Sequence, residues 1–205
     1  MKVLMINGSP HPKGNTFLAL SKVAETLAEE GVESEIVCIG TKAVQGCIAC
    51  YKCTELGHCV FQDELYSTLL EKGKQCDALI VGSPVYYAGP NGSLCAIMDR
   101  LMYSGGKNFA YKPAASVSVC RRGGASASFD RLNKYFTILN MPVVSSQYWT
   151  IAYGRAPGEV EQDGEGMQTM RTLGRNMAWL LKRINNGEEP AHPTPETPVR
   201  TNFIR

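Results

Sequence analysis

Strand-like and helix-like segments alternate along most of this 205-residue chain, and this alternation limits its possible folds more than any other feature. Short apolar runs predict strands, and apolar residues that recur every three or four positions predict helices. The expected strands are 2–6, 33–39, 78–81, 114–120 and 142–145. The expected helices run from residue 15 or 16 to Gly31, then over 63–74, 91–102, 126–139 and 166–184. Strand and helix therefore alternate five times.

Five alternations predict an α/β protein with a doubly wound, five-stranded parallel sheet and helices on both faces. The run 78–81 is apolar without interruption, which is typical of a strand buried on both faces. Since no repeat or second core is visible, we expect one domain over residues 1–186. Residues 187–205 hold four prolines and few apolar residues. They predict an extended C-terminal tail, either disordered or lying over a neighbouring subunit.

The composition excludes several classes of protein. Apolar residues make up 44% of the chain and charged residues 20%, as in ordinary globular proteins, and the formal net charge is only +2. Because the lysines and arginines are scattered, we expect no nucleic-acid partner and no membrane partner. No apolar run approaches the roughly 20 residues that span a bilayer, and no signal peptide is recognisable, so we expect a cytoplasmic protein.

Three loops that follow expected strands, 8–16, 82–92 and 120–124, are unusually rich in small and turn-forming residues. Ligands of doubly wound sheets bind beyond the carboxyl ends of the strands, which is where such loops meet. In the first loop the hydroxyls of Ser9 and Thr16 and the start of a helix suit a phosphate. The loop lacks the dinucleotide and P-loop glycine patterns, and an ordinary strand–helix turn is the alternative.

The other two loops also allow two interpretations each. The second carries an aromatic pair, Tyr86 and Tyr87, which can line a flat ring or can pack on a neighbouring segment. The third, 120–124, offers backbone amides and two cations, or is a solvated turn before a helix. Each loop alone is weak evidence, whereas three loops at the expected edge of one sheet favour a ligand site.

The motifs in these loops resemble a known family. The segments GSPHPKGNT, GSPVYYAGPNG and RRGG, together with Met98-Asp99-Arg100, resemble the NADPH-dependent FMN reductase family of flavodoxin-like proteins, over nearly the whole chain up to about residue 184. The resemblance implies a flavodoxin-like sheet that binds FMN. It assigns the FMN phosphate to Ser9, His11, Asn15 and Thr16, although His11 has solvent exposure as its alternative. It assigns the isoalloxazine ring to Pro84, Val85, Tyr86, Tyr87 and Gly89 on one side and to Cys120, Arg121, Arg122, Gly123 and Gly124 on the other.

Four cysteines, Cys47, Cys50, Cys53 and Cys59, lie within residues 46–60 at the spacing C-x2-C-x2-C-x5-C. Three cysteines at successive x2 spacing are typical of ferredoxin-type loops, whereas zinc sites usually use two C-x2-C pairs far apart. The loop resembles that of the iron-sulfur flavoproteins, which implies that all four thiolates hold one [4Fe-4S] cluster. Free or disulfide-paired thiols, or a zinc ion, are the alternatives.

The resemblance implies an FMN-dependent oxidoreductase that passes electrons from NAD(P)H through FMN to an acceptor, such as a quinone, a free flavin or an iron-sulfur partner. The cofactor supplies the chemistry, so no catalytic side chain is expected. A flavodoxin-type electron carrier without small-molecule turnover is the alternative, although such carriers are typically acidic. A redox- or metal-sensing regulator is a third hypothesis. We expect a homodimer or homotetramer, in which the aromatic loop 147–158 covers the FMN of a partner or packs on its own chain.

Overall fold

The chain folds around a parallel β-sheet, which a computed structural model describes together with its helices over residues 1–185 and Pro193. The strands are β1 (Lys2–Asn7), β2 (Glu33–Cys38), β3 (Ala78–Tyr86), β4 (Gly89–Pro90), β5 (Ala114–Cys120) and β6 (Ile151–Tyr153). Five strands are parallel in the order β2-β1-β3-β5-β6, and β4 pairs antiparallel with the end of β3. This is the doubly wound order of flavodoxin, and the predicted five-stranded parallel sheet is confirmed. Apart from Pro193, the predicted tail lies outside the described residues.

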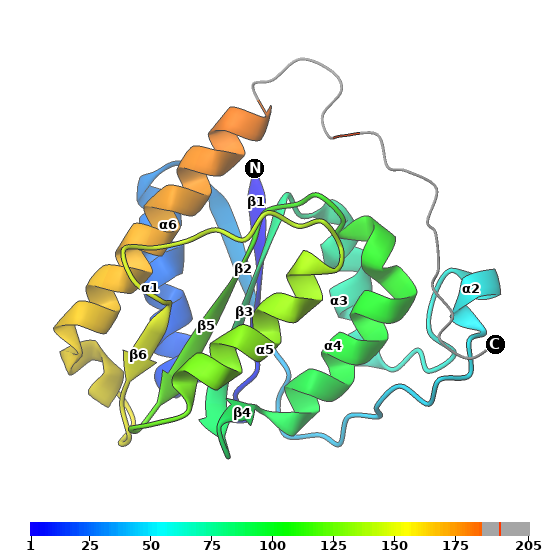
Figure 1. Ribbon diagram of the computed structural model, residues 1–205, viewed down its shortest axis with the longest axis horizontal. Coiled ribbons are helices and arrows are strands. Elements are labelled where there is room, and N and C mark those ends of the chain that lie inside the picture. The colour runs from blue at the N-terminus through cyan, green and yellow to red at the C-terminus, as the bar shows by residue number, and fades with distance from the viewer. Residues whose placement is uncertain (186–192, 194–205) are drawn as a thin grey trace, which may run out of the picture.

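Helices cover both faces of the sheet, as predicted (Figure 1). The α-helices are α1 (Asn15–Glu29), α2 (Cys53–Leu56), α3 (Glu64–Gln75), α4 (Gly92–Gly105), α5 (Ala125–Thr137) and α6 (Gly164–Asn185), and the 3-10 helices are η1 (Gly106–Asn108) and η2 (Glu159–Gln162). Helices α1 and α6 pack on one face, and α3, α4 and α5 pack on the other. Within the described range, no helix has the length and apolar character needed to cross a membrane.

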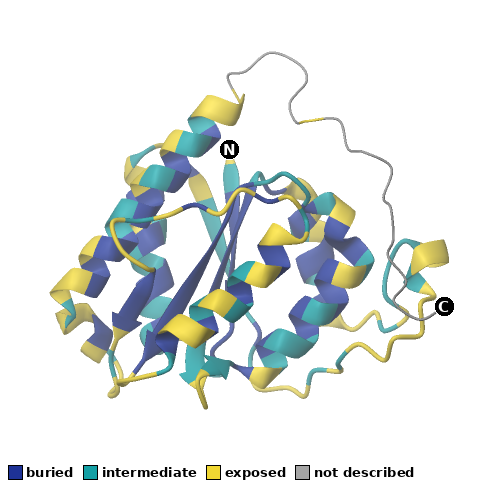
Figure 2. Ribbon diagram, viewed as in Figure 1, coloured by how far each residue is buried: buried dark blue, intermediate teal, exposed yellow. Residues whose placement is uncertain are grey.

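Each face of the sheet carries its own hydrophobic core, and the central strands are buried on both sides (Figure 2). Along β1, Val3 and Met5 point into the core beneath α1 and α6, while Leu4 and Ile6 point into the core beneath α3 and α4. Because successive side chains of a strand face opposite ways, a strand covered on both faces is apolar along most of its length. This explains the uninterrupted apolar runs in the sequence.

The edge strand is not where the sequence predicts it, so the prediction of a strand at 142–145 is wrong. One bridge, between Val143 and Ala114, joins that segment to the sheet. The chain returns to the edge at β6, where Ile151 pairs with Ser118. Between these pairings β5 advances four residues, from 114 to 118, and the edge segment advances eight, from 143 to 151. The surplus residues must leave the sheet, which a regular strand does not allow.

Candidate functional site

An open cleft of 710 Å³ lies where β1, β3, β5 and β6 end. Its walls come from the β1–α1 loop, the last residues of β3, the end of β5 and the segment after β6. The lining residues are Ser9, His11, Pro12, Lys13, Gly14, Asn15, Thr16, Pro84, Val85, Tyr86, Val119, Cys120, Arg121, Gly154, Arg155 and Pro157. A cleft of this size at this edge of a doubly wound sheet is typical of a small-molecule site.

The structure brings most of the predicted flavin residues to this cleft. Nine line it: Ser9, His11, Asn15, Thr16, Pro84, Val85, Tyr86, Cys120 and Arg121. Five are not among the lining residues: Tyr87, Gly89, Arg122, Gly123 and Gly124. The sequence analysis expected the loop 147–158 to cover the FMN of a partner or to pack on its own chain, and did not place Gly154, Arg155 and Pro157 in this cleft. The turn-forming run 154–158 could have indicated this wall, but the misplaced edge strand hid that signal.

Local hydrogen bonds shape the first wall of the cleft. The Ser9 amide donates to Asn7 Oδ1 over 3.1 Å, and Ser9 Oγ accepts from the His11 amide over 3.1 Å. Helix α1 then begins at Asn15 after an extended Gly14, without a side-chain capping hydrogen bond. The amides of an uncapped first turn attract anions, so this end of α1 suits a phosphate.

Asn15 lines the cleft, but its side-chain amide is engaged within the protein. Its Nδ2 donates to the Ala156 carbonyl over 2.9 Å, and its Oδ1 accepts from the Val160 amide over 3.4 Å. The Gly154 amide donates to the Cys120 carbonyl over 3.0 Å at the same junction. A Cβ on Gly154 would lie 2.7 Å from the Val160 nitrogen, so only glycine fits there. These contacts attach the segment after β6 to the start of α1.

A tight hairpin separates the two tyrosines of the second loop. Tyr86 pairs with Gly89, and the two turn residues between them, Tyr87 and Ala88, have positive φ of 49° and 59°. Such a turn usually takes Asn or Gly, so non-glycine residues here store strain of the kind found at functional sites. Tyr86 lines the cleft, whereas Tyr87 is fully exposed.

The residues behind the hairpin hold it in place. The Asn91 amide donates to Ser83 Oγ over 2.9 Å, and Asn91 Oδ1 accepts from the Leu94 amide over 3.1 Å, which caps α4. On the other side Gly124 precedes α5 with φ of 87°, and a Cβ there would lie 2.7 Å from the Ala88 Cα atom. Gly124 therefore supports the hairpin from outside the cleft.

The four cysteines of the loop line a second, much smaller cavity of 20 Å³. The cavity is lined by Cys47, Ile48, Cys50, Tyr51, Cys53, Cys59, Val60, Phe61, Arg100, Tyr103 and Ser104. Ala49 and Tyr51, on either side of Cys50, have left-handed backbones with φ of 51° and 58°. These strained, non-glycine positions bend the loop so that cysteines separated along the chain reach one cavity.

The cysteine loop is not a preformed metal cage. Throughout the part of the chain that the structure describes, no group of three or more His, Cys, Asp or Glu side chains is arranged to hold a metal ion. None of the four cysteines forms a disulfide bond within the described residues. Burial raises the pKa of the Cys53 thiol against the opposing effect of a backbone hydrogen bond, and the neighbouring Cys50, Cys47 and Cys59 add smaller increases. The four thiols line one cavity, and joint ligation of a metal requires them to draw together.

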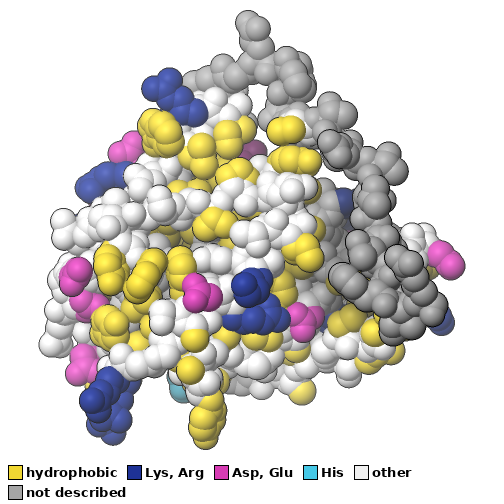
Figure 3. Space-filling view, viewed as in Figure 1, with side chains coloured by type: hydrophobic (Ala, Val, Ile, Leu, Met, Phe, Trp, Pro, Cys, Tyr) yellow, Lys and Arg dark blue, Asp and Glu magenta, His cyan; other side chains and the backbone are white. Residues whose placement is uncertain are grey.

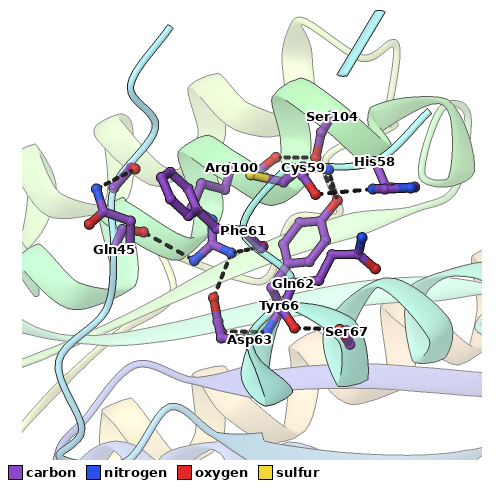
Figure 4. A network of polar contacts seen from close by, with 11 residues as sticks. Gln45, His58, Cys59, Phe61, Gln62, Asp63, Tyr66, Ser67, Arg100 and Ser104 are labelled. Carbon is purple, nitrogen blue, oxygen red and sulfur yellow. Dashed lines mark hydrogen bonds and ion pairs between the residues drawn. The ribbon is translucent and has the colours of Figure 1, made fainter. Parts of the chain in front are cut away.

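Arg100 of α4 connects the two ends of the cysteine loop (Figure 4). Its side chain is fully buried, and its Nη2 forms an ion pair with Asp63 Oδ2 at 2.6 Å. Burial acts to lower the pKa of the guanidinium, but Cys59 and Asp63 outweigh it and raise that pKa. The sequence reasoning noted Arg100 within a family motif and gave it no role.

The strand order and the cleft beyond the strand ends define a protein of the flavodoxin-like class. The chain belongs to the NADPH-dependent FMN reductase family, which it matches over residues 1–156, so the suspected family is confirmed. It is 35% identical over 192 residues to an iron-sulfur flavoprotein of Methanocaldococcus jannaschii, covering 90% of this chain and 99% of that one. An iron-sulfur flavoprotein of Archaeoglobus fulgidus is 30% identical over 175 residues, 83% of this chain and 86% of its own. The fold is similar to that of RosB with bound 8-demethyl-8-formylriboflavin-5'-phosphate, with TM-score 0.73 and 18% identity over 100% of this chain and 92% of RosB.

Membership of this family makes the protein an FMN-binding oxidoreductase that uses a nicotinamide reductant. The predicted enzyme class is therefore confirmed.

Proposed function

We propose that FMN binds in the 710 Å³ cleft and that the protein passes electrons from NAD(P)H through FMN to a separate acceptor, such as a quinone, a free flavin or an iron-sulfur partner. The observation that carries the proposal is the meeting of four loop segments around the uncapped start of α1. When bound, FMN supplies hydride acceptance and onward electron transfer. The protein contributes binding, orientation and charge.

The proposed role of each cleft residue follows from its position in the cleft. Ser9, Thr16 and the first amides of α1 would hold the phosphate, because they lie at the positive end of the helix. Pro84 to Tyr86 would lie against the ring, since they form the wall at the end of β3. Arg121 lines the cleft and would favour a negatively charged ligand.

The described sheet and its two cores include elements from β1 to α6, which supports the predicted single domain over 1–186.

The proposed function includes one [4Fe-4S] cluster held by Cys47, Cys50, Cys53 and Cys59. Three observations support it: the spacing of the cysteines, their common cavity and the strained residues on either side of Cys50. In addition, both relatives described above are named iron-sulfur flavoproteins. A cluster supplies one-electron transfer, which would complement the two-electron chemistry of a flavin.

Anaerobic purification with stopped-flow spectroscopy tests the flavin part of the proposal. We expect about one FMN per chain, reduced rapidly by NADH or NADPH. A protein that takes up no FMN would contradict the proposal. A bound flavin that only reduced ferredoxin can reduce would instead support an electron carrier.

Iron and sulfide analysis of the same preparation tests the cluster. We expect about four of each per chain, as in one [4Fe-4S] cluster. Cys50→Ser should lose the iron and keep the FMN, whereas Cys95→Ser, which removes a thiol outside the loop and both cavities, should keep both. FMN without iron in the wild type would leave the loop with free thiols.

A homodimer or homotetramer also belongs to this proposal. Figure 3 shows hydrophobic side chains gathered on the face that carries α5, β6 and the connection between them. In the connection between α5 and β6, Tyr148 and Trp149 are 59% and 54% exposed, although their rings lie 5.0 Å apart and tilted by 51° to each other. Exposed aromatic pairs of this kind are enriched at protein interfaces.

A further inference from the structure

Arg100 has a buried charge that the flavin cleft does not explain. Its side chain has no exposed area, yet it is not among the residues that line the cleft. A buried guanidinium is costly unless it is paired and hydrogen-bonded. Its partners therefore indicate what the charge is for.

The guanidinium contacts both ends of the cysteine loop (Figure 4). Nη1 donates to the carbonyl of Gln45, two residues before the first cysteine, over 3.2 Å. Nη2 donates to the carbonyl of Phe61, two residues after the last cysteine, and pairs with Asp63 at 2.6 Å. The planar, forked guanidinium donates to the two carbonyls from two different nitrogens, whereas a lysine ammonium would have to reach both from its single nitrogen. Arg100 thus closes the loop at its base.

A second chain of contacts connects the same helix to Cys59. The Cys59 amide donates to the Tyr66 hydroxyl over 2.9 Å, and that hydroxyl lies 2.7 Å from Ser104 Oγ. Ser104 Oγ donates to the Arg100 carbonyl over 2.6 Å. The Tyr66 ring also lies 4.9 Å from the guanidinium carbon. This chain of hydrogen bonds therefore fixes the position of Cys59 relative to Arg100.

One nitrogen of the Arg100 guanidinium, Nε, is buried and, across the described residues, has no hydrogen-bond partner. Arg100 and the four cysteines line the same 20 Å³ cavity. Buried N–H groups are almost always satisfied, so an unsatisfied one beside four thiols indicates a missing acceptor. Sulfur of a cluster or its thiolate ligands is an acceptor of the right kind, since hydrogen bonds to sulfur are common around clusters.

We infer that Arg100 is a positioning residue of the cysteine site, which fixes both ends of the loop and places its free Nε–H and its positive charge against the cluster's sulfur atoms, so that the reduction potential of the cluster rises. The inference rests on the cluster in the proposed function. A [4Fe-4S] cluster with four thiolates is negatively charged, and reduction adds one more electron. A neighbouring cation therefore stabilises the reduced form more than the oxidised form.

Three variants test this role. Arg100→Met removes the charge and keeps an unbranched apolar side chain. Arg100→Lys keeps the charge but replaces the planar guanidinium by a single ammonium nitrogen. Arg131→Met is the matched control, because Arg131 also lies over a tyrosine ring, at 4.4 Å, and pairs with Asp99 at 3.5 Å, but lines neither cavity. Each protein is reconstituted anaerobically with ferrous iron and sulfide. FMN, iron and sulfide per chain, the midpoint potential of the cluster and the rate of iron loss to a chelator are then measured.

We expect Arg100→Met to keep its FMN, to show a lower midpoint potential and to lose iron several-fold faster than the wild type. Arg100→Lys should recover most of the potential but should still lose iron faster, and Arg131→Met should match the wild type. A wild-type potential in Arg100→Met, or wild-type iron loss in Arg100→Lys, would overturn the inference. If Arg100→Met does not fold, the iron loss of Arg100→Lys decides. If the wild type takes up no iron and sulfide, the cluster proposal and this inference fail together while the flavin proposal stands.

Discussion

Replacing Gly154 by alanine perturbs the junction that closes the cleft. The added Cβ would lie 2.7 Å from the Val160 nitrogen and 3.0 Å from Asn15 Nδ2. Because the Val160 nitrogen belongs to the backbone of η2, no side-chain rotation relieves the contact. Either the η2 segment or β6 must move, and the hydrogen bonds between Asn15 and this segment must lengthen.

The size of the effect follows from these contacts. Moving the Val160 nitrogen from 2.7 Å to the 3.4 Å at which ordinary contacts begin requires a shift of 0.7 Å. Overpacking of this kind costs about 1–3 kcal/mol. For a chain of this length, a loss of about 2 kcal/mol lowers Tm by about 4–8 °C. Because the displaced segment forms a wall of the cleft, we also expect the FMN Kd to rise about tenfold, equivalent to about 1.4 kcal/mol.

Thermal unfolding of the FMN-free protein measures the first quantity, and titration of FMN fluorescence measures the second. Gly164→Ala is the matched control, since a Cβ there meets no atom within 4 Å. It should leave both quantities close to those of the wild type. If Gly154→Ala behaves like this control, the segment after β6 does not depend on close packing against α1, and the reasoning is refuted.

Three further predictions concern the cleft wall, the sheet edge and the outer surface. Tyr86→Ala should raise the FMN Kd about tenfold, whereas Tyr87→Ala should change it less than about twofold in the same titration, because only Tyr86 lines the cleft. A hydrogen bond from Lys72 holds the pKa of Glu35 below its ordinary value. The stability advantage of the wild type over Glu35→Gln should therefore be complete above that ordinary value and shrink as pH falls through the folded-state pKa, which urea unfolding across pH would measure. The wild type should elute as a dimer or tetramer in gel filtration and Trp149→Glu at a smaller size; a wild-type monomer at micromolar concentration would contradict the predicted assembly.

The sheet was predictable because the amino-acid composition of each central strand reflects its burial on both faces. The run 78–81 faces a core on both sides, so every residue in it is apolar whatever the rest of the chain does. The edge strand lacks such a signal. Ile151–Tyr153 is only three residues long and pairs with one neighbour, so its position depends on where the bulge after Val143 ends.

The candidate site was predictable only where its residues lie in loops of unusual composition. Adjacent tyrosines look equivalent in a sequence, and only the hairpin geometry sends Tyr86 to the cleft and Tyr87 to the surface. The contacts of Arg100 reach residues 55 and 39 positions away, so no local pattern could contain them. Asn15 likewise meets partners 141 and 145 positions away.

Helix α4 fixes the distance between the flavin cleft and the cysteine cavity, and their relative orientation. Its cap, Asn91, is anchored to Ser83 beside the flavin wall, and Arg100 is anchored to the cysteine loop. The nine residue steps from 91 to 100 correspond to about 13.5 Å along a helix axis. A helix cannot change the number of residues between two anchors without changing both their separation and their relative direction. One inserted residue between these anchors would turn the guanidinium by about 100° and lengthen the separation by about 1.5 Å. Insertions and deletions should therefore be selected against within this stretch of α4.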